Sequence, residues 1–468
     1  MFGFPSQLAA FALVLASHAV AAAPAPAPVH MHDAAQRQGV AATFLADHAG
    51  TATTPPRFAV TTLADAGPGS LRDAVEQANA EPGIAVVEID AALEGMIQLA
   101  GRALYITDSI VIIGPGADRL ALDAGGRHGV IATATYGFET IDVAILGLTI
   151  RGGATDRGAG IASSKTNLLL ADAIVEDNNT TNSIVEEQGG GLRLDGGSLR
   201  LNRCEFRRNS AGVTGGGVAV LNASVSIIDS AFQNNIAKRG AGLYIETPQA
   251  VDIRRSVVAF NRAGRRGAGI DLTASGSEAV IENVTISGNF VYGEQPADGG
   301  AGLALTGSAR VALSTIANNL AYTLWRNPDA AAGLQYDSSY GVLFLNGTLL
   351  WGNATLDGNL DLGRSGIGGI DAYSNLVGTM TPDAINGAAQ DNLLAVDPLL
   401  GPLADNGGPT MTHAIAANSP ARDGATWIQF YVATDQRGFS RRQDGDPALD
   451  IGAYEYGADR LFASGFED

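Results

Sequence analysis

The stretch "GAGIDLTASGSEAVIENVTISGN", Gly267 to Asn289, opens with a glycine turn and continues with apolar residues at alternate positions. One polar residue separates Ile270 from Leu272, and one separates Val284 from Ile286. A period of two residues is typical of a β-strand with one buried face. Glycine and asparagine are residues that tight turns favour. The stretch therefore predicts short strands joined by tight turns.

The same pattern recurs along the middle of the chain and aligns on one asparagine per copy. A bulky apolar residue lies three positions before each of these asparagines, as Phe206 does before Asn209. A copy this short has no core of its own, so it must stack on its neighbours with like residues above like residues. The sequence thus predicts an all-β fold, a parallel β-helix. The aligned asparagines are Asn178, Asn209, Asn235, Asn261, Asn289, Asn319 and Asn353, with Gly153 as a degenerate earlier member.

Composition agrees with such a fold and excludes several classes of protein. The chain has 468 residues, 46% of them hydrophobic, and a formal net charge of −19. Its 60 glycines follow no strict three-residue period, which excludes collagen. The negative charge argues against nonspecific binding to nucleic acid or to anionic membranes. Because Cys204 is the single cysteine, packing and hydrogen bonds must stabilise the fold without an internal disulfide.

The N-terminal region predicts export. Residues 1–23 form an apolar, alanine-rich segment typical of a secretion signal, with Ala19-Val20-Ala21 as the cleavage site. No later stretch is long and apolar enough to cross a membrane as a helix, so we expect a secreted or cell-surface protein without a transmembrane span. Residues 24–56 follow as a Pro/Ala linker that we expect to be extended. His30 and His32 in this linker lack further ligands nearby, so no metal site is predicted there.

Residues 57–100 predict a cap that closes one end of the β-helix. A strand begins at Arg57, and a Gly-Pro-Gly turn precedes a short amphipathic helix. Ser70 is suited to the N-cap position of this helix, with Asp73 at N3.

The repeated asparagines are interpreted as structural residues. At a corner of a solenoid, asparagine can adopt the left-handed backbone conformation while its amide bonds to the asparagine one rung away. Cys204 occupies a small inward position and is expected to pack rather than react. Outward charges of opposite sign alternate in consecutive copies and predict a ladder of ion pairs: Asp172, Arg203, Asp229 and Arg255.

A basic cluster is the candidate binding site. Lys238-Arg239 and Arg265-Arg266 stand at the same offset before "GAG" in adjacent copies, so like charges should lie close together and repel without an anion between them. Tyr244, on the strand after the first pair, is expected to point outward and stack on a sugar face. The cluster favours an anionic polysaccharide or cell-surface glycan as partner. The alternative interpretation is a set of solvated turn residues.

No catalytic or cofactor motif stands out. The sequence has no zinc-type spacing of His and Cys, no G-x-S-x-G motif and no phosphate-binding loop. No catalytic residue and no cofactor is therefore predicted. Asp444, Asp446 and Asp450 are a candidate for calcium, but they lack the order of a calcium-binding loop.

Two stretches carry a resemblance to a known family. "FAVTTLADAGPGSLRDAVEQAN", Phe58 to Asn79, resembles the CSLREA-type cap of bacterial surface proteins with pectate-lyase-like right-handed β-helices, although "GSLRDA" lacks the first residue of that hexapeptide. "TDQRGFSRRQDGDPALDIGAYEY", Thr434 to Tyr456, resembles their choice-of-anchor Q module. The resemblance implies a right-handed helix and export but no characterised activity. Together with the repeats it divides the remaining chain into a β-helix over 101–396, a C-terminal capping module over 397–456 and a tail over 457–468.

These observations leave three hypotheses for function. The leading one is a non-catalytic, exported β-helix that presents a binding face, as an adhesin or an envelope component. The second is a polysaccharide lyase or hydrolase acting on an anionic glycan. A lyase needs a basic side chain whose pKa is lowered enough to remove a proton, and its candidates are Lys238, Arg239, Arg265 and Arg266. The third is a structural scaffold.

Overall fold

The computed structural model describes residues 29, 31, 33–48, 54–133, 139–180, 188–293, 299–323, 330–338, 340–430, 432–441 and 448–458. The predicted secretion signal lies outside these residues, as do His30, His32, Asp444, Asp446 and almost all of the predicted tail.

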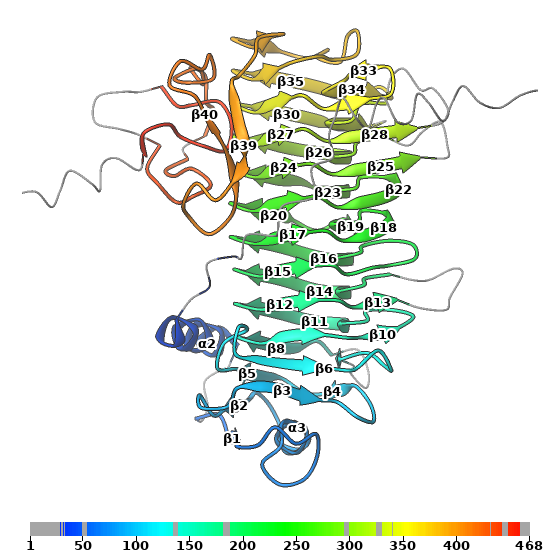
Figure 1. The fold of residues 1–468 in the computed structure, drawn as a ribbon, viewed down its shortest axis with the longest axis vertical. Helices are drawn as coiled ribbons and strands as arrows, with labels where there is room; N and C mark the ends of the chain where they lie inside the picture. The colour runs from blue at the N-terminus through cyan, green and yellow to red at the C-terminus, as the bar shows by residue number, and fades with distance from the viewer. Residues whose placement is uncertain are drawn as a thin grey trace, which may run out of the picture.

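The chain winds into a rod of β-strands stacked rung on rung (Figure 1). Among the residues described, sheet A contains 18 strands, sheet B 12 and sheet C 6, and a two-stranded sheet of β10 (Ala154–Thr155) and β13 (Asn179–Thr180) precedes sheet C. Within the rod, each described strand pairs in parallel with its equivalent in the next coil, except β32 with β33. Successive rungs of such a stack are roughly 4.8 Å apart. The fold is the parallel β-helix that the sequence predicts.

The bounds of the strands follow the repeat. Sheet A consists of β1 (Arg57–Val60), β2 (Ala85–Ile89), β4 (Leu104–Ile106), β5 (Ile110–Ile113), β7 (Ile131–Thr133), β8 (Ile141–Leu146), β11 (Ile161–Ala171), β14 (Leu192–Asn202), β16 (Val218–Ile228), β19 (Leu243–Thr247), β20 (Val251–Arg254), β23 (Ile270–Glu282), β26 (Leu303–Ala312), β29 (Leu334–Asp337), β30 (Val342–Asn346), β34 (Leu362–Ser365), β35 (Gly369–Tyr373) and β37 (Ala389–Gln390).

Sheet B consists of shorter strands: β3 (Gly95–Gln98), β6 (Leu120–Asp123), β9 (Thr149–Arg151), β12 (Ile174–Glu176), β15 (Glu205–Arg207), β17 (Ala231–Gln233), β21 (Val257–Ala259), β24 (Thr285–Ser287), β27 (Thr315–Ala317), β31 (Leu349–Trp351), β36 (Leu376–Val377) and β38 (Leu393–Leu394). Sheet C consists of β18 (Ile236–Arg239), β22 (Arg262–Arg266), β25 (Phe290–Gly293), β28 (Leu320–Thr323), β32 (Ala354–Thr355) and β33 (Gly358–Asn359).

Like residues stack on like residues through the core. In sheet B, Val175 pairs with Phe206, and Phe206 pairs with Phe232 in the next coil. The rings of Phe206 and Phe232 are stacked, with their centroids 5.4 Å apart. Burying one such side chain stabilises the fold by about 1.5–3 kcal/mol. The column of bulky residues that the sequence predicts therefore forms one wall of a continuous core.

The predicted cap forms at the N-terminal end. Helix α3 (Leu71–Ala78) begins after Ser70, whose side chain accepts a hydrogen bond from the backbone N–H of Asp73, as expected for this N-cap. Its apolar side, including Leu71 and Val75, belongs to the same core as the coils. Because β1 and β2 pair with each other and β2 pairs with β5, the cap is continuous with sheet A.

The predicted extended linker is wrong in part, because Ala34–His48 forms helix α2. Ala41 and Phe44 of this helix pack against residues of β5 and β8 whose side chains point away from the rod core. The Arg37 guanidinium also donates a hydrogen bond to the Pro115 carbonyl, at 2.8 Å. The helix forms here because sheet A offers it an apolar outer face: Val86, Val111, Ile113, Ala144, Leu146, Leu169 and Ala171.

The C-terminal module lies along the flank of the rod and not over its end (Figure 1). It contains the antiparallel pair β39 (Leu400–Ala404) and β40 (Thr412–Ile415). Asn283 donates to the Thr434 carbonyl at 2.9 Å, and Ser287 lies 2.8 Å from the His413 ring. The module packs here because sheet B and its turns present apolar side chains outward. The apolar contact joins Leu313, Leu349 and Leu376 of the coils to Ile415, Ala421, Ala425, Val432, Leu449 and Ile451 of the module.

Candidate functional site

The predicted asparagines form one buried ladder. Each side-chain Nδ2 donates to the Oδ1 of the next asparagine at 2.8–3.1 Å, from Asn178 through Asn353. Each Nδ2 also donates to a backbone carbonyl of the preceding coil, as Asn261 does to Phe232 at 2.9 Å. The amides are fully used within the fold, so the ladder has a structural role.

The asparagine was expected to adopt the left-handed backbone conformation at this corner. That expectation is wrong, because the residue before the asparagine adopts it. These preceding residues have φ between 54° and 70°. They turn the chain while the asparagine points inward, where its amide reaches the next rung. They are Asp177, Arg208, Asn234, Phe260, Gly288, Asn318 and Gly352.

The predicted charge ladder includes an ion pair between Arg255 and Asp229. Arg255 Nε lies 2.8 Å from Asp229 Oδ1 across one rung. Cys204 is fully buried, and burial raises the pKa of its thiol to about 12. Such a thiol is almost entirely protonated at neutral pH, in agreement with a packing role.

Two arginines of the predicted basic cluster, Arg239 and Arg266, bind a carboxylate of the chain itself. Arg239 Nε lies 2.8 Å from Asp271 Oδ2, and Arg266 Nε lies 3.3 Å from Asp271 Oδ1. Asp271 is only 1% exposed. Burial works against the charged form of Arg239, but the Asp271 carboxylate outweighs it and leaves the pKa of Arg239 above its usual value. A raised pKa is the opposite of what a lyase base needs.

Tyr244 is buried, which corrects the expectation that it offers a stacking surface. It is 7% exposed, and its hydroxyl donates to Glu246 Oε2 at 2.6 Å. The guanidinium carbon of Arg239 lies 5.3 Å from the centre of its ring. Tyr244 and Asp271 occupy the same register position in neighbouring coils, and Arg239, which binds Asp271, also covers the tyrosine. Burial raises the pKa of this hydroxyl.

The structure separates the predicted basic residues into two sets. Arg239 and Arg266 turn toward Asp271 on sheet A, and Arg266 Nη1 also lies 3.4 Å from Asp337 Oδ2. Lys238 and Arg265 are exposed on sheet C.

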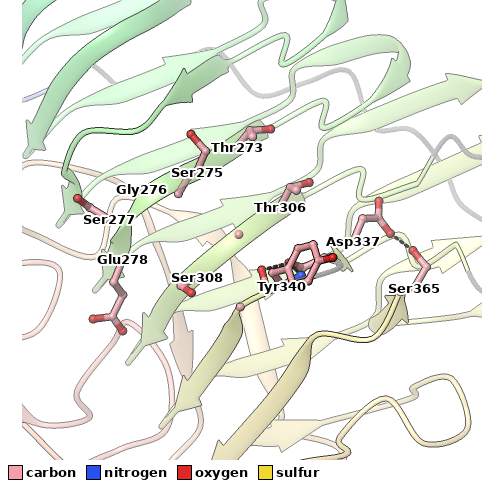
Figure 2. A pocket seen from close by; sticks show the side chains of 15 residues that line it. Thr273, Ser275, Gly276, Ser277, Glu278, Thr306, Ser308, Asp337, Tyr340 and Ser365 are labelled. Carbon is pink, nitrogen blue, oxygen red and sulfur yellow. Dashed lines mark hydrogen bonds between the residues drawn. The ribbon is translucent and has the colours of Figure 1, made fainter.

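A groove of about 830 Å³ lies on the outer face of sheet A, beside the ion pairs of Arg239 and Arg266 with Asp271 (Figure 2). Its lining comes from β23, β26, the β29–β30 connection and the end of β34, so it crosses several coils. Gly307, with φ 97°, brings its backbone against the Ala274 carbonyl, where a Cβ would collide, and the register of β23 with β26 shifts between Ala274 and Ala279. Hydroxyl groups dominate the lining: Thr273, Ser275, Ser277, Thr306, Ser308, Ser338 and Ser365.

Tyr340 projects an exposed aromatic ring at this groove. It is 87% exposed, although Ser338 fixes its backbone by donating to the Tyr340 carbonyl at 2.5 Å. The register of β30 with β35 places Ile367, which is 79% exposed, in the equivalent position of the next coil. The groove thus combines an apolar surface with many hydroxyl groups.

The carboxylates of the groove are Glu278 and Asp337. Asp337 accepts hydrogen bonds from Gln335 Nε2 at 2.8 Å and from Ser365, in addition to its contact with Arg266. Glu278 is exposed and points away from Asp337 (Figure 2). Among the described residues that line the groove there is no Lys or Arg. The groove is therefore polar and acidic.

The groove was not predicted from the sequence, although the spacing of the repeat marks its position. The interval from Asn319 to Asn353 is 34 residues, whereas Asn209 to Asn235 is 26. Part of the extra length lies between Asp337, where β29 ends, and Leu343 of β30, in the segment that carries Tyr340. An insertion in one coil of a regular solenoid is a candidate binding segment.

The described residues contain neither a candidate metal site nor a candidate membrane-spanning helix. Within them, no three His, Cys, Asp or Glu side chains converge to hold a metal ion. Asp450, from the calcium candidate, is 1% exposed and accepts hydrogen bonds from the backbone of Asp423 and Tyr456. None of the helices described in the structure is both long and apolar enough to span a bilayer.

Comparison with known proteins identifies the fold. Residues 129–321 match the family model described as right handed beta helix region. Among solved structures, the crystal structure of pectate lyase Pel9A is similar, with 14% sequence identity, a TM-score of 0.47, and coverage of 87% of this chain and 98% of that chain. No curated protein matches the chain. The chain forms a right-handed parallel β-helix.

Proposed function

We propose that this chain is a non-catalytic, exported β-helix that binds an uncharged glycan in the groove on sheet A. The observation that carries the proposal is the ring of Tyr340, 87% exposed beside a lining rich in hydroxyl groups. Aromatic rings offer large apolar contact surfaces, and the C–H face of a sugar is well suited to such a surface. Hydroxyl groups donate and accept hydrogen bonds, as sugar hydroxyls require.

Charge supports an uncharged ligand in this groove. Its carboxylates are Glu278 and Asp337, of which Asp337 contacts Arg266 from outside the lining, and the described lining has no cation to neutralise a uronic acid or a sulfate. An anionic chain would therefore meet like charge here. The groove crosses several coils, which suits an extended polymer better than a single sugar.

The position of the protein outside the cell is part of the same proposal. The apolar leader at residues 1–23 supports export. The resemblance of Phe58–Asn79 and Thr434–Tyr456 to CSLREA-type and choice-of-anchor Q surface proteins supports a place on the surface or in the extracellular matrix.

The experiment is to incubate the purified chain with dextran, β-glucan and galactomannan while bound polysaccharide and new chain ends are measured in parallel. Binding without new ends is the expected result for at least one polymer. New reducing or unsaturated ends would show that the chain is an enzyme, contrary to the proposal. Absence of binding to every uncharged polymer would refute the groove as a glycan site.

A further inference from the structure

The outer face of sheet C carries apolar and basic side chains together. Inward residues such as Ala237, Ala263, Val291 and Ala321 form a buried alanine-rich cluster. The residues that alternate with them point outward, toward solvent. We call this outward set the sheet C strip: Ile236, Lys238, Arg262, Phe290, Tyr292 and Leu320.

No helix or module of the described chain is seen to cover the strip, whereas sheets A and B each have apolar residues on their outer sides that another part of the chain covers. Helix α2 covers apolar residues on sheet A, and the C-terminal module covers those beside sheet B. On sheet C, by contrast, Ile236 and Tyr292 are each 43% exposed. Exposed apolar groups arranged on neighbouring strands are typical of a binding surface.

The aromatic rings and the cations of the strip are arranged in register. Arg262 pairs with Phe290 across one rung, and its guanidinium carbon lies 5.8 Å from the centre of the Phe290 ring. The rings of Phe290 and Tyr292 are 6.1 Å apart. Tyr292 in turn pairs with Tyr322 in the next coil, so aromatic groups repeat along the stack.

Lys238 and Arg262 supply positive charge on the same strip as these rings. Both side chains are exposed, and neither forms an ion pair with a carboxylate among the residues that the structure describes. This contrasts with Arg239 and Arg266, which bind Asp271. The strip therefore has positive charge available to an outside ligand within a chain of net charge −19.

We propose that the sheet C strip binds an anionic polysaccharide. The carboxylate or sulfate groups of such a chain pair with Lys238 and Arg262, and its sugar faces lie on Tyr292 and Phe290. Rungs roughly 4.8 Å apart present these contacts at regular intervals, as a repeating polymer does. The site is separate from the groove, so it does not depend on the function proposed above.

The test measures binding of alginate to the full chain by titration calorimetry at several salt concentrations. The Lys238→Ala/Arg262→Ala variant should bind at least tenfold more weakly and show a smaller salt dependence, and Tyr292→Ala should also weaken binding. Arg127→Ala, at an exposed arginine of an earlier coil, is the matched control and should bind like wild type. Tyr340→Ala should leave alginate binding unchanged, which separates this site from the groove.

Three outcomes would overturn the proposal. They are absence of alginate binding at low salt, equal loss in Arg127→Ala, and equal binding of poly-glutamate, which carries carboxylates without sugar faces. Equal thermal melting of all variants, expected because the changed side chains are exposed, shows that a loss of binding is not a loss of folding.

Discussion

Asn353 donates hydrogen bonds from both its backbone N–H and its side-chain Nδ2 to Asp361 Oδ1, at 2.9 and 2.7 Å. Asp361 thereby ends the asparagine ladder, and its Oδ2 accepts from the backbone and side chain of Thr379 at 2.8 and 3.0 Å. One buried carboxylate thus joins the last ladder asparagine to the next coil.

Asp361→Ala leaves these buried donors without an acceptor. Because an unsatisfied buried group costs about 1–3 kcal/mol, we expect a loss of about 3 kcal/mol or more in the free energy of unfolding. Chemical denaturation followed by circular dichroism measures the loss. Glu81→Ala, at an exposed carboxylate after helix α3, is the control and should change stability by less than about 0.5 kcal/mol. Equal stability of the two variants would contradict the role of Asp361.

Asp271→Asn should also destabilise the fold. It removes the negative charge between Arg239 and Arg266, and breaking a buried ion pair costs about 3 kcal/mol or more. The matched control is Asp252→Asn, since Asp252 pairs with Arg254 at 2.7 Å on the surface, where such a pair contributes at most about 1 kcal/mol. Chemical denaturation measures the free energy of unfolding of both variants. A smaller loss for Asp271→Asn than for Asp252→Asn would show that the ion pairs of Asp271 with Arg239 and Arg266 do not stabilise the fold.

The C-terminal module should detach more readily in mild acid because of His413. Its Nδ1 lies 2.8 Å from the Gly401 carbonyl and must carry the proton, so its Nε2 accepts from the Ser287 hydroxyl at 2.8 Å. Burial lowers the pKa of this histidine below its usual value near 6.5. The unfolded state therefore binds a proton before the folded state does, and stability falls as the pH drops below about 6.5, by at most about 1.4 kcal/mol per pH unit.

The measurement compares the melting temperature of wild type and His413→Gln between pH 7.5 and pH 5. The wild type should lose more stability over this range than the variant, which lacks the titrating ring. Parallel pH profiles would mean that His413 does not contribute.

Tyr340→Ala should weaken binding of an uncharged glycan about tenfold without changing stability. An aromatic contact contributes up to about 1.5 kcal/mol beyond the area it buries, which corresponds to this factor. Tyr105→Ala is the control, since Tyr105 is 49% exposed on β4, far from the groove. Affinity electrophoresis in gels containing the bound polysaccharide gives the comparison. Similar retardation of both variants would exclude Tyr340 from the site.

Much of the rod could be predicted because its signal is local and repeated. A period of two residues and a fixed distance to the next asparagine were sufficient to place Val175, Phe206 and Phe232 in one column. The N-cap at Ser70 followed from residues within one helical turn. Each of these features depends on a short stretch of chain or on equivalent positions in adjacent copies.

The features that were missed depend on surfaces between distant segments. Helix α2 is stabilised by the outer face of sheet A, and no periodicity near Phe44 reveals that face. The burial of Tyr244 could have been predicted more easily. Asp271 stands at the same position of the next copy, so the two residues could have been compared. Tyr340 lies in a coil of unusual length, where the repeat that guided the prediction is interrupted.

The position of the C-terminal module affects how the rod reaches its final state. In a simple solenoid each coil contacts only its neighbours, so folding can advance coil by coil as the chain is made. Here Asn283 bonds to Thr434, and Arg441 bonds to Asn283, across 151 and 158 residues. Contacts over such separations close large loops and form slowly. The outer side of the middle coils near Asn283 therefore stays uncovered during synthesis. It is covered only after residues near Thr434 have been made and have packed back along the rod.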